Sequence, residues 1–179
     1  MFDDIAFRHK SYTPLLIPLE KLHLTLGVMT IDAANTSFLK DLSNVVDDAL
    51  VKHFQRGPIQ LCFRGLGTFN HGRVLFSRVV AEEDYMRLEQ MVRFLRAEIG
   101  GGLNIDIQGN PHDSYVPHIT LAKIRPQLKH QFGTEIPHEI WAQDRFSDFG
   151  RVSFRAIDLC EMKSDPHTGY YSVVHTASL

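Results

Sequence analysis

Two short stretches of the chain alternate between apolar residues and a His-x-Thr pair. In the first, His23 and Thr25 alternate with three leucines, and in the second, His118 and Thr120 alternate with Pro, Ile and Leu. A period of two sends successive side chains to opposite faces of a strand, so each His shares a face with its Thr. The pattern predicts two strands, Lys21–Met29 and Tyr115–Ile124, each with an apolar face toward a core.

The remaining periodicities predict an α+β domain. Apolar residues recur at helical spacing over Asn35–Phe54 and Asp84–Ile99, and Gly67–Gly72 has the composition of a hairpin loop. Further strands are expected at Ile59–Leu66, Arg73–Val80, Leu103–Ile107, Val152–Met162 and Tyr170–Ala177, and a short helix at Pro137. This order indicates mainly antiparallel sheet with helices outside. Because the His-x-Thr element occurs once in each half, we expect two similar lobes.

Length and charge limit the kinds of ligand. The 179 residues suffice for a single domain over 1–179, in which residues 1–20 show no period and are expected to be irregular. No apolar run approaches the roughly 18 residues of a membrane span, so we expect no membrane insertion. The net charge of −2 provides no general attraction to long nucleic acids, so an anionic ligand must be held locally. A nucleotide or single-stranded RNA end fits this balance better than a duplex.

Cysteine usage indicates the compartment. Only Cys62 and Cys160 are present, and the start of the chain lacks the regions of a secretory signal. We expect a reducing cytoplasmic or nuclear location, with a disulfide between the two cysteines as an open alternative.

The duplicated pair suits phosphodiester chemistry without a metal or cofactor. Such a reaction needs a base for the attacking hydroxyl or water and an acid for the departing oxygen, and two imidazoles can supply both near neutral pH. Threonine hydroxyls can donate to the phosphoryl oxygens as charge builds there. A lone histidine on an apolar strand would more simply be structural, but two matching pairs favour a shared site. No His or Cys spacing typical of zinc is present.

These residues resemble the two-histidine (2H) phosphoesterases. Leu22–Leu26, Gly65–Phe69, Phe149–Gly150 with Ile157–Cys160, and Gly169–Tyr171 are similar to the family of the central domain of A-kinase anchoring protein and its 2′,5′ RNA ligase-like relatives. The resemblance implies a two-lobed fold around a cleft lined by His23, Thr25, His118 and Thr120. It also implies a strand and helix before the first pair. That strand and helix are expected to be missing here, so a protein partner or flanking domain could complete the sheet edge.

Three further residues are candidates for substrate binding. Lys123 ends the second predicted strand and could contact a phosphate, although strict alternation would place it opposite His118. Phe76 could stack on a base or pack in the core. Tyr115 could line the cleft or the core.

Three functions compete. The first is a phosphodiesterase of 2′,5′-linked oligonucleotides, 2′,3′-cyclic phosphates or RNA ends, in which either histidine could be the acid. The second is a module that binds AMP, CMP or RNA ends with little turnover. The third is a scaffold with incidental histidines. We expect a monomer in each case.

Overall fold

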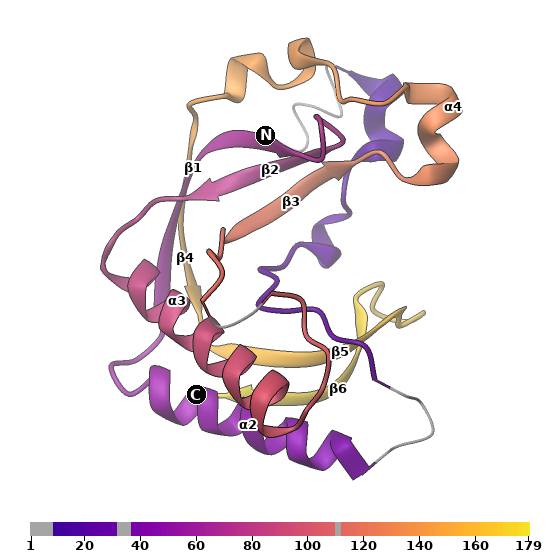
Figure 1. Ribbon diagram of the computed structural model, residues 1–179. Helices are drawn as coiled ribbons and strands as arrows, with labels where there is room; N and C mark the ends of the chain where they lie inside the picture. Colours follow the sequence, from indigo (N-terminus) through magenta and orange to yellow (C-terminus); the bar gives the residue numbers. More distant parts are fainter. Residues whose placement is uncertain (1–8, 32–36, 110–111) are drawn as a thin grey trace. The chain divides into compact units, whose positions relative to one another are not determined.

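The computed structural model describes residues 9–31, 37–109 and 112–179, which divide into two compact units (Figure 1). The first unit holds the described residues up to Leu24 together with Cys62–Val80 and Pro117–Arg151. The second unit holds the described residues of Thr25–Leu61, Ala81–Val116 and Val152–Leu179. The boundary at Leu24 therefore falls inside the first His-x-Thr pair.

A four-stranded sheet with strand order β3–β2–β1–β4 supplies the framework of the first unit (Figure 1). Its strands are β1 (Ile59–Phe69), β2 (Val74–Val79), β3 (His118–Lys123) and β4 (Asp148–Phe154). Strand β2 pairs antiparallel with β1 on one side and with β3 on the other. The predicted hairpin is confirmed, but β1 continues through Phe69. A tight turn with positive φ at Asn70, His71 and Gly72 then reverses the chain.

One face of this sheet packs on an apolar core. The buried members are Leu15, Leu66, Leu75, Leu121, Ala122, Ile124, Ile136 and Ile140. The N-terminal segment is part of this core: 3-10 turns form at Lys10–Leu15 and Leu19–Lys21, and Leu15 is only 1% exposed. Burial of one such leucine contributes about 1.5–3 kcal/mol. The segment expected to be irregular thus forms two 3-10 turns, the first of which contributes Leu15 to the core. Residues 1–8 lie outside the described part.

The second unit packs two helices with a two-stranded antiparallel sheet. Helix α2 (Ser37–His53) packs against α3 (Glu83–Arg96) and against β5 (Ala156–Ser164) and β6 (Tyr171–Ser178) (Figure 1). The predicted helical stripes are confirmed by burial at Leu42, Val46, Ala49, Leu88, Met91, Val92 and Leu95. Mixed helix and antiparallel sheet is the class expected from the sequence.

The first His-x-Thr pair does not lie in a regular strand, so that prediction is wrong. Leu24 bridges Ile119, and Met29 bridges Ile107, each as an isolated pair. The strand expected at Leu103–Ile107 is also wrong, because Ala97–Gly102 forms a π-helical turn and Asn104 then adopts a positive φ of 55°. That conformation interrupts the extended geometry a ladder requires.

The C-terminal third differs from its prediction in two ways. The strand expected at Val152–Met162 is two strands in different sheets, since β4 ends at Phe154 and β5 begins at Ala156. A short helix α4 (Lys129–Phe132) was not expected, and the helix predicted at Pro137 is reduced to a 3-10 turn at His138–Ile140. Strand β6 confirms the last prediction within one residue at each end.

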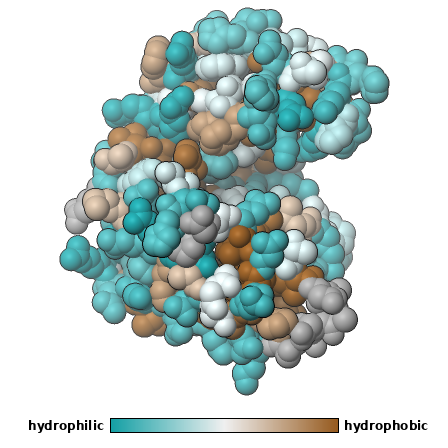
Figure 2. Space-filling model, in the orientation of Figure 1, coloured by the Kyte–Doolittle hydropathy of each residue, from teal (hydrophilic) through white to brown (hydrophobic). Residues whose placement is uncertain are grey.

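Two further features of the structure are the hydropathy of its surface and the state of its two cysteines. Hydrophilic side chains predominate on the face shown in Figure 2, with apolar ones in separate patches. No helix within the described ranges has the length and apolarity to span a bilayer. Cys62 is buried and Cys160 half-buried, and both are free thiols, so the alternative of a disulfide between them is not realised.

Candidate functional site

The pairing of β2 with β3 brings polar and aromatic side chains onto the sheet face opposite the core. Arg78 pairs with His118, and Phe76 pairs with Thr120. Directly paired residues in an antiparallel ladder project to the same side. These four side chains therefore share one face of the first unit, which we call the histidine face.

A β-bulge adds Lys123 to the histidine face. The register shifts so that Leu75 pairs with Ala122 while Phe76 pairs with Thr120, which leaves Leu121 as the extra residue on β3. Leu121 and Ala122 are both buried in the core of the first unit, so two successive side chains point the same way. Lys123, paired with Val74, then returns to the side of Thr120. The expectation that strict alternation would place it opposite His118 is wrong because of this bulge.

His23 reaches the same face through a single backbone bridge. Leu24 bridges Ile119, whose side chain packs against the core, so the residue before Leu24 projects to the opposite face. The Nδ1 atom of His23 lies 2.8 Å from the carbonyl oxygen of Lys21. A carbonyl only accepts, so this hydrogen bond requires a proton on Nδ1. Nε2 is then the atom that can exchange a proton with a substrate.

His118 rests edge-on against two stacked phenyl rings. The rings of Phe69 and Phe76 stack with centroids 4.0 Å apart, and His118 meets them at 4.9 and 5.3 Å with interplanar angles of 72° and 63°. Edge-to-face packing of this kind fixes ring orientation. Phe76 is 4% exposed, so its predicted stacking on a base is disfavoured, whereas half-buried Phe69 offers more surface.

Sequence reasoning missed Phe69, Gly67 and Arg78. The sequence pattern predicts Phe69 in the hairpin loop, whereas it is the last residue of β1. Gly67 pairs with Phe76, and an added Cβ there would lie 2.7 Å from Phe76 Cζ and 2.9 Å from Arg78 Nη2. The absence of a side chain at this position lets the guanidinium of Arg78 lie across β1.

Thr25 and Tyr115 belong to the second unit. The hydroxyl of Tyr115 donates a 2.7 Å hydrogen bond to the Thr25 carbonyl. Burial raises the pKa of Tyr115, so the hydroxyl keeps its proton and remains a donor. The guanidinium of Arg96 lies 5.8 Å from the Tyr115 ring centroid and donates to the Asp113 carbonyl at 3.1 Å. This arrangement holds the backbone at Thr25.

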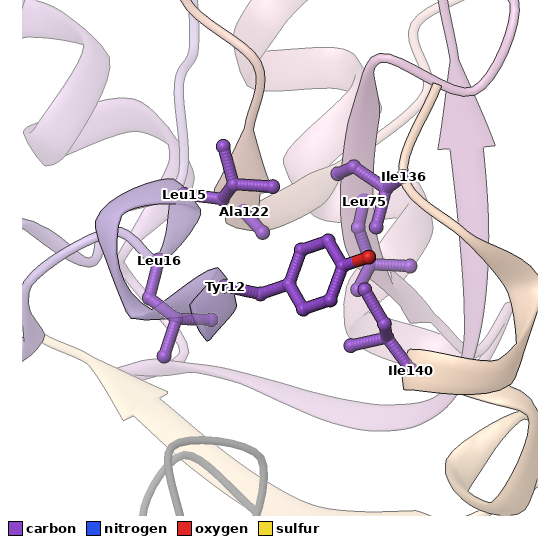
Figure 3. A pocket seen from close by; sticks show the side chains of 7 residues that line it. All are labelled: Tyr12, Leu15, Leu16, Leu75, Ala122, Ile136 and Ile140. Carbon is purple, nitrogen blue, oxygen red and sulfur yellow. The ribbon is translucent and has the colours of Figure 1, made fainter. Parts of the chain in front are cut away.

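Two cavities, one in each unit, are lined by residues other than the two histidines. Figure 3 shows apolar side chains of the first unit converging on a gap of about 10 Å³ beside Tyr12, which has room for at most one water molecule. A larger hollow of about 690 Å³ in the second unit is lined by Arg96, Gly100–Gly101 and Asn104–Ile107 among others. In the described ranges, no three His, Cys, Asp or Glu side chains are grouped as metal ligands.

Comparison with known proteins identifies the fold and the family. The crystal structure of TT0787 from Thermus thermophilus shares 23% identity with this chain at a TM-score of 0.63, covering 99% of this chain and 91% of that one. A protein described as a phosphoesterase shares 15% identity at a TM-score of 0.55, with coverages of 98% and 88%. At such identities the likeness shows a common fold. No curated protein matched in sequence. The model of the family described as "AKAP7 2'5' RNA ligase-like domain" matches residues 2–179. The structural neighbours have a 2H phosphoesterase-like fold, in agreement with this match. The chain therefore belongs to the AKAP7 2'5' RNA ligase-like family.

Proposed function

We propose that the chain is a metal-independent phosphodiesterase of 2′,5′-linked oligonucleotides, 2′,3′-cyclic phosphates or RNA ends. The observation that supports this proposal is the register of β2 with β3 and the bridge from Leu24 to Ile119, which favour two imidazoles, a hydroxyl and an ammonium group on one side of the sheet. His23 and His118 approach from two different chain segments, and Thr120 and Lys123 flank them on β3.

The two imidazoles divide the proton transfers. One takes a proton from the attacking water or ribose hydroxyl as its oxygen bonds to phosphorus. The other gives a proton to the departing oxygen as its bond to phosphorus breaks. Each turnover leaves the pair with its protons exchanged, and solvent restores them. The bond from His23 Nδ1 to the Lys21 carbonyl supports Nε2 as the transferring atom in this residue. The roles of acid and base depend on which way the substrate lies.

Hydroxyl and ammonium groups stabilise the phosphoryl oxygens. Thr120 pairs with Phe76 on the histidine face and is part-exposed. Lys123 is exposed and follows the bulge further along β3. Donors fixed before the reaction lose little free energy to reorganisation as negative charge develops. Thr25, two residues after His23, completes the set by the alternation of an extended chain. Tyr115 acts in this proposal through the Thr25 carbonyl and not by touching substrate.

A product-resolved digest tests the proposal. Purified protein is incubated in chelator with 2′,5′-linked, 3′,5′-linked and 2′,3′-cyclic substrates, and the products are separated by chromatography. Cleavage of at least one 2′,5′-linked or cyclic substrate is expected, and its product shows which bond breaks. Survival of all three substrates, together with micromolar binding of AMP or CMP in calorimetry, would establish the binding module instead.

A further inference from the structure

Arg78 carries a charge that no described carboxylate neutralises. Two other arginines are ion-paired: Arg64 meets Asp148 at 2.8 Å and Arg87 meets Asp84 at 2.6 Å. Arg78 instead donates from its Nε to the Leu66 carbonyl at 3.0 Å, and its side chain is exposed. A guanidinium remains positively charged under all physiological conditions. The histidine face therefore has a second cationic position besides Lys123.

The guanidinium is fixed in place. Its Cζ lies 5.9 Å from the Phe76 centroid, and the bond to Leu66 anchors it over the strand next to its own. The missing side chain of Gly67 provides the space, since a Cβ there would come within 2.9 Å of Nη2. Because Nε is used by the carbonyl, the terminal nitrogens can present paired donors to an anion. Phosphate oxygens match that fork geometry.

The position of the guanidinium distinguishes it from the groups around the scissile phosphate. His118 and Thr120 lie on β3, at one side of β2, whereas the guanidinium reaches across β1, at the other side. His118 and the guanidinium both contact the Phe76 ring, whose centroid lies 5.3 Å from that of the His118 ring and 5.9 Å from Arg78 Cζ. The hydrogen bond to Leu66 therefore directs the guanidinium toward β1, away from the strand that carries His118 and Thr120.

We infer that Arg78 binds the phosphate adjacent to the scissile one, so that the substrate is an oligonucleotide with at least two phosphates. The inference rests on the proposed function for its scissile site and adds a subsite to it. Phe69, which stacks on Phe76 beside this path, is placed to contact the nucleotide between the two phosphates.

The test compares substrates that differ by one phosphate. A 2′,5′-linked diadenosine monophosphate is cleaved beside the same dinucleotide carrying an added 5′- or 2′-terminal phosphate. Wild-type protein is expected to prefer one of the phosphorylated forms. In Arg78→Gln, KM for that form should rise about ten- to hundredfold, the range for a lost charge-assisted hydrogen bond, while the monophosphate is little affected. Arg78→Lys should retain part of the preference.

Arg64→Gln is the matched control, because it removes the same charge from β1 at a residue paired with Asp148. Equal losses on all substrates in Arg78→Gln, or no preference in the wild type, would overturn the inference and leave the proposed function intact. If the wild type cleaves nothing, the proposed function fails and calorimetry decides the subsite. Adenosine 2′,5′-bisphosphate should then bind more tightly than either monophosphate in the wild type, and that advantage should disappear in Arg78→Gln.

Discussion

The two His-x-Thr pairs have the same side chains but different backbone support. His118 and Thr120 lie in β3, where a ladder to β2, interrupted by the bulge at Leu121, sets every residue from Arg78 to Val74 opposite a partner. His23 lies in an extended segment with one bridge, from Leu24 to Ile119. Side-chain hydrogen bonds to carbonyl groups supplement that bridge, from His23 to Lys21 and from Tyr115 to Thr25.

This difference shows that a motif can be positioned in two ways. In a ladder, orientation follows from register, and single side chains contribute little to it. In a bridged segment, orientation depends on the few hydrogen bonds that replace the ladder, each with a net contribution of about 0.5–1.5 kcal/mol. Substitutions of supporting residues should therefore affect the first pair more than the second, whereas substitutions of the reacting groups should affect both equally.

The largest expected effect is loss of either imidazole. His23→Ala and His118→Ala should each lower kcat by about 10²–10⁴-fold, the contribution typical of a positioned acid or base. Steady-state cleavage of the substrate identified in the digest measures this, with His167→Ala as control because His167 lies in the exposed turn before β6. If one histidine variant kept most of its activity, the two pairs would not be chemically equivalent.

The second largest decrease in kcat is expected from removal of the two threonine hydroxyls. Thr25→Val and Thr120→Val keep the shape of the side chain and remove its donor, which should cost about 10²–10³-fold in kcat for a group that binds a developing oxyanion. Thr→Ser should restore much of the activity at Thr120, because the ladder fixes the backbone there. Restoration at Thr25 should be weaker. Serine rescue of equal extent at both positions would remove the distinction between the two kinds of support.

Residues with strong periodicity were predictable, and those that depend on pairing were not. Leu42, Val46 and Ala49 lie on one helical face because spacing alone determines it. The place of Lys123 could not be derived, because the bulge at Leu121 results from how β3 meets β2 and leaves no mark in the local sequence. The two histidines were found from chemistry, but Arg78 required the register that pairs it with His118.

Interruptions of the extended chain were equally hard to predict. The stretch from Val152 to Met162 reads as one strand, and its division at Arg155 follows from pairing with two different sheets. In the segment Leu103–Ile107, the alternation predicts a strand, but the left-handed Asn104 breaks it. Local pattern sets which face is apolar, whereas the partner determines whether a ladder forms.

A smaller effect should come from the hydroxyl of Tyr115. Tyr115→Phe removes the donor to the Thr25 carbonyl and should lower the free energy of unfolding by about 0.5–1.5 kcal/mol. We expect kcat to fall several-fold with little change in KM. In the Tyr115→Phe background, Thr25→Val should lower kcat by a smaller factor than it does in the wild type, whereas the effect of Thr120→Val should be unchanged. Double substitutions with Thr25→Val and Thr120→Val measure this coupling. Tyr12→Phe is the control, because Tyr12 packs against Phe132 in the first unit. Equal coupling to both threonines would contradict support specific to the first pair.

The smallest effect concerns a histidine outside both pairs and separates activity from stability. Burial, with added repulsion from Lys52 and Arg87, lowers the pKa of His53 below its ordinary 6.5. As pH falls below 6.5, the unfolded chain binds a proton at this position that the native state resists, so native stability declines through the window down to the folded pKa. The melting temperature of His53→Gln should therefore fall less between pH 7 and pH 5 than that of the wild type. The difference between the two drops should be on the order of 1 °C. Melting curves at the two pH values measure this, with His167→Gln as control. Identical pH slopes in both variants and the wild type would show that His53 is not the acid-sensitive group.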